Sequence, residues 1–497
     1  MRLLRFCRAG TWSLLASLLS CSQSVSTSSN SNTGTGTGGT PSYHPADGGS
    51  AGQSSRADAA TASLIPCLVD PIDASPASDP ADAQSTSAPE ISEASSALTR
   101  NTSPSVGDSD FQAVIGAANQ FGFDLFHQIL PGETGNMVFS PVSTVYALGM
   151  TYLGARGNTQ TQMATVLHDT FGSGVYHSGL NRLSLALANR NVTPHQTQYG
   201  CMSATLTLEN AIWCQLGFTL STSYLDDLSA NYGAGVKLLD FVRNAEVSRN
   251  TINLWVAHQT AHLILDLLPP DSIQPGTRLV LTDTLYFKGW WNTPFSPTNT
   301  TPEVFTRIDG SRVNVSTMHE YRDVLYGWGT NYTMIDLPYD GNQLSMAFVL
   351  PDSGQFNAVR DGLTQDWRTQ ALSQMLKTGV NLVIPKFGFT WGTADLTPAL
   401  QALGIRDAFD YPSADFTGIE ATRDLSLSGV FHKAFVGVDE STTVATAATA
   451  EVSVTVALAG AGRGGLFFVL DRPFLFFIHD ATGAVLFIGQ VLDPNAS

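Results

Sequence analysis

Aromatic side chains are almost absent between residues 22 and 108, and they become frequent immediately after that stretch. The stretch consists mainly of Ser, Thr, Gly, Ala, Asp and Pro, as in SNTGTGTGGTPSYHPADGGSAGQSS. Such a composition buries too little apolar surface to offset the conformational entropy that is lost on folding. We therefore predict a flexible linker over residues 22–108 and a folded domain over residues 109–497, which contains the hydrophobic core.

The first 21 residues carry the pattern of an export signal. Three arginines precede an apolar stretch over residues 12–19, which is too short to cross a bilayer permanently. The sequence LLSC at residues 18–21 resembles a lipoprotein cleavage site, in which Cys21 becomes the lipidated first residue. We expect residues 1–21 to be a signal peptide that exports the protein. Either Cys21 then anchors it at the cell surface, or ordinary cleavage releases it.

Export also affects the expected state of the cysteines. Removal of Cys7 and lipidation of Cys21 would leave Cys67, Cys201 and Cys214, an odd number in an oxidising compartment. Cys201 and Cys214 could pair, whereas Cys67 in the linker is expected to be a free thiol. No spacing of Cys and His residues fits a structural zinc site.

The charge of the chain argues against several classes of partner. The formal net charge is −17 and the isoelectric point lies near 4.8. An acidic surface repels phosphate and sulfate groups, so nucleic acids and other polyanions are not expected as partners. After residue 109 no apolar run is long enough for a membrane helix, so membrane contact is expected only through a lipid anchor.

Helical patterns come before strand patterns in the folded part. Residues 110–130 place apolar side chains at helical spacing, and a second helix is expected to begin at Ser140 and Pro141, with the Ser140 hydroxyl as its cap. Helical patterns recur to about residue 188. Strand-like runs follow at residues 206–214, 279–287, 344–350, 379–384, 431–438, 452–456, 466–469, 474–479 and 485–491. Helices followed by antiparallel strands predict one α+β domain.

The usual catalytic motifs are missing from the sequence. There is no GxSxG, no HExxH and no cysteine with a recognisable histidine partner motif. His258 and His262 lie four residues apart on a predicted helix, but Gln259 stands where a zinc protease carries Glu, so we interpret them as surface histidines. The glycine-rich run at residues 460–465 has no βαβ unit to follow it and is expected to be a loop. The sequence therefore predicts neither an enzyme nor a cofactor or metal site.

An unusual segment follows Glu440. It reads STTVATAATAEVSVTVALAGAGRGGLFF, contains small and β-branched residues but no Pro, and lies between two predicted strands. Small residues allow a segment to be threaded between existing strands, and β-branched residues favour the strand conformation once it is there.

Several motifs occur in a fixed order along the folded part. They are FSPVSTVYALGMTYLGARGNTQTQM, INLWVAHQT, LVLTDTLYFKGWW, LSMAFVLP, IPKFGF, LGIRDAFD, ADFTGI, LSLSGVFHKAFVGVDE and DRPFLFFIHDATGAVLFIGQV. In this order, over about residues 109–494, the chain resembles the serpin family of serine protease inhibitors. The resemblance implies the serpin fold, in which helices pack on a large central β-sheet with smaller sheets and an exposed reactive-centre loop.

The resemblance also implies a mechanism. In serpins a target protease cuts the reactive loop, the loop inserts into the central sheet as a new strand, and the covalently attached acyl-enzyme is dragged away and distorted. This chain is then expected to act as a monomer against a serine protease. The alternative is a protein with the serpin fold that is cut as a substrate or serves as a binding module.

The hinge of the loop can be assigned by the same resemblance. Glu440, Thr442 and Thr443 match the family's hinge, although Thr442 replaces the usual Gly and Val444 the usual Glu. The small-residue run of inhibitors matches a segment that includes Ala445, Ala447 and Ala448. In a gapless register Glu451 points to the inner face of the sheet, where an unpaired carboxylate would be costly.

Two ways of counting along the chain give different positions for the scissile bond. Counting from the hinge places it between Val456 and Ala457, with the next bond toward Leu458 as the runner-up. Counting back from the Pro473 motif gives a position near Arg463 instead. A small apolar Val456 suits elastase-like proteases, and chymotrypsin-like serine proteases are the alternative targets.

Two further regions are implied by the resemblance. Ser140, Ser143 and His432 match the serpin shutter, the polar cluster where the central strands part, and Asp283 stands where the family has Asn. These residues predict an ion pair between Asp283 and His432 within a buried network, although the cluster could be purely structural. Trp291 lies at the position of the breach, where the loop first enters the sheet, and is otherwise expected to be a core residue.

Overall fold

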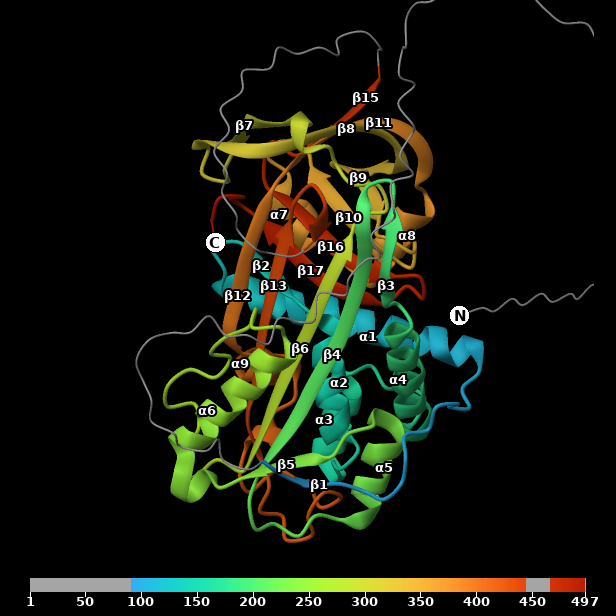
Figure 1. Cartoon of the computed structure of the whole chain (residues 1–497). Coiled ribbons are helices and arrows are strands. Elements are labelled where there is room, and N and C mark those ends of the chain that lie inside the picture. Colours follow the sequence, from blue (N-terminus) through green and yellow to red (C-terminus); the bar gives the residue numbers. More distant parts are fainter. Residues whose placement is uncertain (1–90, 444–464, 497) are drawn as a thin grey trace, which may run out of the picture. The chain divides into compact units, whose positions relative to one another are not determined.

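A computed structural model describes residues 91–443 and 465–496. It confirms the predicted α+β class, with helices packed against two large sheets (Figure 1). The helices within these residues are α1 (Asp108–Ile129), α2 (Pro141–Tyr152), α3 (Gly157–Val166), α4 (Ser173–Ala188), α5 (Thr222–Tyr232), α6 (Phe241–Gln259), α7 (Phe356–Asp361), α8 (Gln365–Ser373) and α9 (Thr397–Leu403). Short 3₁₀ turns occur at Leu130–Gly132, Pro297–Asn299 and Asp407–Phe409.

The first sheet has eight strands and contains the central strands of the candidate site. Its main path runs β1 (Ser92–Ala94), β5 (Val236–Leu239), β4 (Gly200–Gln215), β6 (Leu279–Trp290), β13 (Leu427–Val438), β12 (Phe387–Asp395). In addition β3 (Val192–Thr197) pairs with β4, and the two-residue strand β14 (Thr442–Thr443) pairs with β6. The neighbours β6 and β13 run parallel, whereas β6 and β4 are antiparallel.

The second sheet has nine strands and carries the C-terminal part of the chain. Its path runs β15 (Leu466–Val469), β11 (Leu376–Pro385), β8 (Arg312–Gly329), β9 (Tyr332–Pro338), β10 (Leu344–Pro351), β16 (Phe474–Asp480), β17 (Val485–Val491), β2 (Met137–Phe139), and β7 (Thr300–Thr306) pairs with β8. The apolar strands β16 and β17 are almost entirely buried, as their continuous hydrophobic sequences predict.

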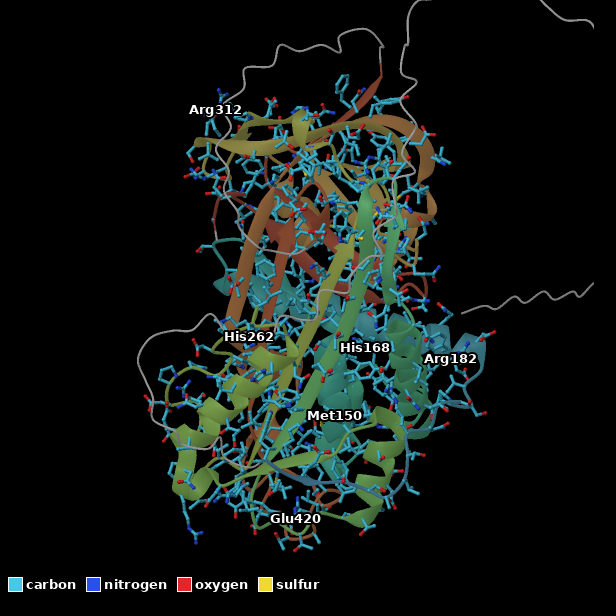
Figure 2. The ribbon with its side chains drawn as sticks, in the orientation of Figure 1. Met150, His168, Arg182, His262, Arg312 and Glu420 are labelled. Atoms are coloured by element: carbon cyan, nitrogen blue, oxygen red, sulfur yellow. The ribbon has the colours of Figure 1, made fainter. Side chains whose placement is uncertain are left out.

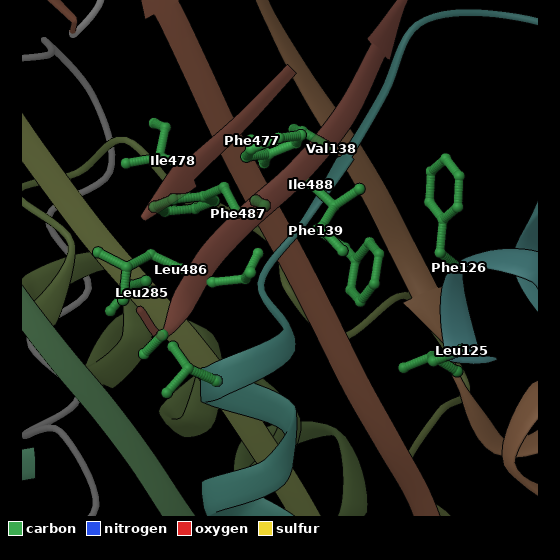
Figure 3. Packing of buried hydrophobic residues seen from close by; sticks show 14 of the residues in the cluster. Leu125, Phe126, Val138, Phe139, Leu285, Phe477, Ile478, Leu486, Phe487 and Ile488 are labelled. Carbon is green, nitrogen blue, oxygen red and sulfur yellow. The ribbon is translucent and has the colours of Figure 1, made fainter. Parts of the chain in front are cut away.

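The hydrophobic core has two parts, one on each face of the first sheet. The larger part joins α1, α2 and both sheets, and Figure 3 shows some of its side chains, among them Phe139, Leu285 and Ile488. The smaller part lies between α6 and the opposite face of β4, β6 and β13, where it includes Trp213, Val280 and other apolar side chains. Strand β6 therefore sends alternate residues to two separate apolar environments.

Helix α2 illustrates how the sequence determines a buried element. Ser140 caps its N-terminus by accepting a hydrogen bond from the backbone N–H of Ser143, and Pro141 occupies the first turn, as predicted. Every residue of the helix is buried, because it packs between α1 and strands β4, β6 and β17. A helix that is enclosed on all sides can hold polar side chains only where each finds a partner.

The predicted linker extends too far toward the C-terminus. Within residues 91–107, β1 pairs with β5 at the edge of the first sheet, and Ile91 packs on the smaller core. Arg100 donates to Asn181 of α4 at 2.9 Å, and Asn181 in turn donates to the carbonyl of Asn101 at 2.7 Å. Apart from the packing of Ile91 these contacts are polar, so the hydrophobic pattern of the sequence gave little sign of them.

The suggested pairing of Cys201 with Cys214 is also wrong. Cys214 is a free, buried thiol. Both residues lie on the single extended strand β4, thirteen positions apart, a separation of roughly 43 Å at the rise of a β-strand. A disulfide requires Cα atoms within about 7 Å, which this strand excludes. Cys7, Cys21 and Cys67, together with the predicted signal peptide, lie outside the described residues.

Residues 91–107 should contribute measurably to stability. We expect a chain that begins at residue 108 to unfold about 3–4 °C below one that begins at residue 91. This corresponds to roughly three net hydrogen bonds at about 1 kcal/mol each in a domain of this size. Thermal unfolding of the two chains tests this prediction, and Arg100→Ala in the longer chain should reproduce part of the loss. Equal unfolding temperatures would show that the segment contributes no net stability.

Candidate functional site

The central strands β6 and β13 are paired over only half of their length. Register pairs join Leu279–Asp283 of β6 to Leu427–His432 of β13. Farther along, β6 instead pairs with β14, where Thr443 lies opposite Gly289 and Thr442 opposite Trp290. Within the part of the chain that the structure describes, β6 residues 284–288 between these two points have a strand partner only on the β4 side.

A buried polar cluster lies where the β6–β13 pairing ends. His432, the last paired residue of β13, forms a hydrogen bond through Nδ1 to Oδ1 of Asp283, directly opposite on β6. Both side chains are completely buried. The backbone N–H of Ser140 donates to His432 Nε2 at 3.2 Å. Three of the four predicted shutter residues are therefore in direct contact.

The hydrogen bonds determine the tautomer of His432. A backbone N–H can only donate, so Nε2 of His432 must accept from Ser140 and carries no proton. The ring proton then sits on Nδ1 and is donated to Asp283. The pair is a neutral imidazole that donates to a carboxyl group, rather than the ion pair that the sequence suggested.

Ser143 belongs to the same cluster but contacts different partners. Its hydroxyl donates to Oδ1 of Asn210 on β4 at 2.9 Å, and Asn210 donates back to the Ser143 carbonyl at the same distance. The Asn210 side-chain oxygen also accepts from the backbone N–H of Thr284. Asn210 thus connects α2, β4 and β6, and the sequence analysis missed it because a single Asn on a strand gives no signal of its own.

The carboxyl group of Asp283 is only half satisfied. Its Oδ1 accepts from His432, and the hydroxyl of Thr144 lies 3.5 Å away from the same oxygen. Its Oδ2 is buried and has no hydrogen-bond partner in the structure. A buried acceptor without a partner is destabilising, so the Oδ2 atom of Asp283 lowers the stability of the folded protein.

The segment that leads into β14 forms a tightly bonded turn. Asp439 accepts from the backbone N–H groups of Ser441 at 2.8 Å and Thr442 at 2.7 Å, and the Asp439 N–H donates to the Thr442 carbonyl. Thr442 has no left-handed φ, so the uncut chain does not need the Gly that Thr442 replaces.

Thr443 and Trp291 lie on either side of one tyrosine. The buried Thr443 hydroxyl is 2.9 Å from the hydroxyl of Tyr339, and the Trp291 ring stacks on the Tyr339 ring with centroids 4.7 Å apart. Trp291 also donates from Nε1 to the carbonyl of Asp439 and from its backbone N–H to that of Ser441. The structure thus brings the predicted breach residue into contact with the hinge segment.

Glu440 connects the hinge to Lys386, which lies between β11 and β12, and to β7 of the second sheet. Its carboxylate accepts from Lys386 Nζ at 2.7 Å and from the hydroxyl of Thr300 at 2.8 Å. Burial acts to raise the pKa of Glu440, but the hydrogen bonds from Lys386 and Thr300 outweigh it and leave the pKa below its ordinary value. The ionised form therefore holds the hinge in place.

Some predicted site residues cannot be placed. Ala445, Ala447, Ala448, Val456 and Ala457 lie between residues 444 and 464, outside the described residues. The residues that the sequence analysis missed are Asn210, Asp439, Tyr339, Lys386 and Thr300. Lys386 does lie within the quoted motif IPKFGF, so its proximity to Glu440 is the one contact that this motif could have indicated.

Residues 91–443 and 465–496 contain no group of three or more His, Cys, Asp or Glu side chains that could hold a metal ion. Within the same ranges no helix is both long and apolar enough to cross a membrane. His258 and His262 have ring centroids 5.1 Å apart.

Comparison with known proteins gives a consistent result. The family model described as serpin (serine protease inhibitor) matches residues 116–494. An uncharacterised serpin-like protein of Thermococcus kodakarensis is 34% identical over 77% of this chain and 86% of its own length. The leukocyte elastase inhibitor of Xenopus tropicalis is 33% identical over 76% of this chain and 98% of its own. The native-state structure of the thermophilic serpin tengpin is similar with a TM-score of 0.68 and 26% identity, covering 81% of this chain and all of that one.

The unpartnered oxygen of Asp283 leads to a stability prediction. Asp283→Asn keeps the Oδ1 acceptor for His432 but removes a negative charge from a fully buried site, so we expect stability to rise by about 1–2 kcal/mol. Asp283→Ala, which removes the acceptor as well, should be less stable than the wild type. Thermal unfolding at one scan rate measures both changes. A lower unfolding temperature for Asp283→Asn would mean that the charge itself stabilises the cluster.

The lowered pKa of Glu440 leads to a prediction about pH. Because the folded-state pKa lies below the reference value of 4.5, the stabilising effect of the ionised group is fully present above that value. It is lost as the pH falls through the folded-state pKa. We therefore expect wild type to unfold at a higher temperature than Glu440→Gln at pH 6, and the difference to shrink below about pH 4.5.

Lys386→Met provides the matched control for this pH effect. In that background the substitution Glu440→Gln should have much less influence, since the principal partner of the carboxylate is absent. An undiminished difference between Glu and Gln at pH 3, or in the Lys386→Met background, would contradict the assignment.

Proposed function

The chain belongs to the serpin family, and we propose that it inhibits a serine protease by being cut after Glu440 and inserting the cut segment between β6 and β13. The observation that carries the proposal is the pairing of Thr443 with Gly289 on β6. This pairing begins a strand at one end of β6, and the adjoining edge of β6 has no other described partner on that side.

The register of β14 predicts where each later residue would lie. Continuing the antiparallel pairing from Thr443 and Gly289 places Ala445 opposite Phe287, Thr449 opposite Asp283 and Ser453 opposite Leu279. Ten residues from Val444 to Ser453 would therefore fill the distance to the beginning of β6, roughly 33 Å of strand. The hinge count places the scissile bond just beyond, at Val456 and Ala457, which supports that assignment over a position near Arg463.

The two faces of β6 explain the alternation of residues in the segment. Odd-numbered β6 residues such as Leu285 and Phe287 face the larger core, and Val280 faces the smaller core beneath α6. Opposite residues of an antiparallel pair share a face, so Ala445 and Ala447 would face the larger core. Val452 would join the apolar surface around Val280. The small residues Ala445 and Ala447 thus fall on the side of the larger core.

Insertion would require the polar cluster to open. Residues 279–283 of β6 and 427–432 of β13 are already paired, and a strand placed between them moves them apart by one strand spacing of about 4.8 Å. The contact between His432 and Asp283 would break at that step. The uncut form would then be kept by a kinetic barrier, while the longer sheet of the cut form is the more stable state.

One residue of the segment opposes this mechanism. Glu451 would lie opposite Leu281 and face the larger core, where a carboxylate without a partner is costly. This position favours a second candidate function, in which insertion is too slow to trap the protease and the protein is cut as a substrate.

The proposed target follows from the residue before the scissile bond. Val456 has a small apolar side chain, which fits a protease with a shallow primary pocket, as in elastase-like enzymes. One relative is named leukocyte elastase inhibitor, which agrees with this choice. A chymotrypsin-like protease is the second choice. From the signal-like residues 1–21 we further propose that the protein is exported, with Cys21 as its lipid anchor.

Two substitutions on adjacent residues test the insertion mechanism. Ala445→Glu would place a carboxylate opposite Phe287 in the core, so we expect it to abolish the covalent complex with pancreatic elastase while cutting continues. Val444→Glu is the matched control, because residue 444 would face outward opposite the exposed Lys288 and should retain the complex.

Denaturing gels measure the covalent complex, and mass spectrometry locates the cut. Wild type and Val444→Glu should both give a complex that survives denaturation, and cutting should raise their unfolding temperature. The absence of a complex from wild type, with clean cutting near residue 456, would establish the substrate function instead. Equal complex formation by the Ala445→Glu chain would contradict the proposed register.

A further inference from the structure

Cys201 carries a disulfide bond whose partner lies outside the described part of the chain. Cys201 is disulfide-bonded, whereas Cys214, the other cysteine of the described residues, is a free, buried thiol. The chain has three further cysteines, Cys7, Cys21 and Cys67, and all of them precede residue 91. The partner of Cys201 is therefore one of these three residues.

Processing of the exported chain leaves one of the three available. Cys7 lies within the expected signal peptide and is removed with it, and lipidation occupies the sulfur of Cys21. Burial raises the pKa of Cys214 to about 12, which keeps that thiol protonated and unreactive. The odd number of cysteines in the exported chain then becomes one inert thiol, Cys214, and one pair, Cys67 with Cys201.

The surroundings of Cys201 allow a second segment to approach it. Cys201 is exposed, near the beginning of β4, and pairs with Gln196 in the hairpin that β3 forms with β4. Its sulfur lies 3.3 Å from Oε1 of Gln196, a van der Waals distance that needs no thiol proton. Tyr199 in the same hairpin is 45% exposed, and LIPCLV around Cys67 is the most apolar run of the linker. Apolar contact with Tyr199 would favour the approach of the two cysteines.

The linker is long enough to reach Cys201. Ser92 of β1 lies opposite Leu238 of β5, which in turn lies opposite Cys214 of β4. The first described residues thus lie near the end of β4 that is farthest from Cys201, thirteen positions or roughly 43 Å away (Figure 1). The 25 residues from Cys67 to Ser92 span at most about 85 Å, so the bond can close while β1 stays paired.

Cys201 also lies at the end of the first sheet where the hinge begins. Gly289 of β6 pairs on one side with Ala204 of β4 and on the other with Thr443 of β14. Cys201 is three positions beyond Ala204 on β4. A segment bonded to Cys201 is therefore fixed at the hinge end of the sheet, whereas β1 is fixed at the opposite end.

We propose that Cys67 and Cys201 form a disulfide bond that fastens the linker to the hinge end of the first sheet. The two thiols lose two protons and two electrons to the disulfide of an oxidising thiol catalyst, which becomes a dithiol. This inference rests on the export part of the proposed function, because such bonds persist in an oxidising compartment. The bond would keep the domain attached to the anchored part of the chain even after a cut within residues 68–90.

Counting reactive thiols in the exported full chain under denaturing conditions tests the pairing. Among the cysteines after residue 21, wild type should react with iodoacetamide only at Cys214. Cys67→Ser and Cys201→Ser should each expose one additional thiol, whereas the matched control Cys214→Ser should leave none. Mass spectrometry without reductant should find the Cys67 peptide joined to the Cys201 peptide. Three reactive thiols in wild type, or Cys201 joined to Cys21 or to a second copy, would overturn the proposal.

A cut in the linker tests the consequence of the bond. Glu90 is the only Glu among residues 1–90, so brief treatment with a Glu-specific protease should cut the linker there. On denaturing gels the fragment that ends at Glu90 should stay joined to the wild-type domain until reductant is added. In Cys67→Ser it should separate without reductant. Separation of the wild-type fragment without reductant would contradict the proposed bond.

A reduced chain separates this inference from the proposed export. The full chain with Cys7→Ser and Cys21→Ser is made in a reducing cytoplasm and then treated with oxidised glutathione. One remaining reactive thiol would support the pairing, even if the wild-type protein were never found outside the cell and export were wrong. Three reactive thiols after this treatment would refute the pairing, even if export were correct.

Discussion

The hydrogen bond between His432 and Asp283 joins the two strands whose separation the proposed mechanism requires. It lies at the last register pair of β6 and β13, and the backbone of Ser140 fixes the orientation of the imidazole. Apolar contacts around it would hold the strands with a nearly uniform strength, whereas a buried hydrogen bond breaks abruptly and leaves unsatisfied groups behind. A polar contact at this point can therefore act as a barrier to opening without making the closed sheet the most stable state. The unpartnered Oδ2 of Asp283 keeps the cluster from becoming too stable.

The hinge contacts address a second problem, which is the exposed edge of β6. Residues 284–288 of β6 offer backbone groups with no described partner on one side, and such an edge can pair with a strand from another molecule. Thr442 and Thr443 already occupy the adjoining positions, where Asp439 and Tyr339 hold them. The same contacts that start insertion in the proposed mechanism also restrict access to the edge. Glu440 reinforces this arrangement from the outside through Lys386.

Prediction from the sequence succeeded for features that depend on residues close together in the sequence. The sequence indicated the cap at Ser140, the buried strands β16 and β17 and the order of motifs. Capping, hydrophobic runs and spacing are local properties of a sequence. Partners such as Asn210 and Asp439 were missed, since their role exists only after β4 and the hinge turn meet α2 and β14. Residues 91–107 were wrongly assigned to the linker for a related reason. Their sequence is polar, but their backbone pairs with β5 and α5 rather than relying on a hydrophobic face.

Successive residues of β6 face the larger and the smaller core in turn. This alternation relates the structure to the sequence of the segment after Glu440, which is proposed to be cut. In the proposed mechanism, a strand inserted beside β6 would contact two different surfaces, the larger core and the smaller core under α6. Alanines at 445 and 447 suit the first surface, and Val452 suits the second. Glu451 is the exception, and it falls below the level of Asp283, beyond the point where the paired halves of β6 and β13 must separate. In the proposed mechanism, insertion as far as Thr449 would therefore meet only small side chains and one existing polar cluster, whereas the last steps would also have to bury a carboxyl group. The balance between trapping a protease and releasing it would thus be decided late in insertion, by one residue, rather than at the hinge.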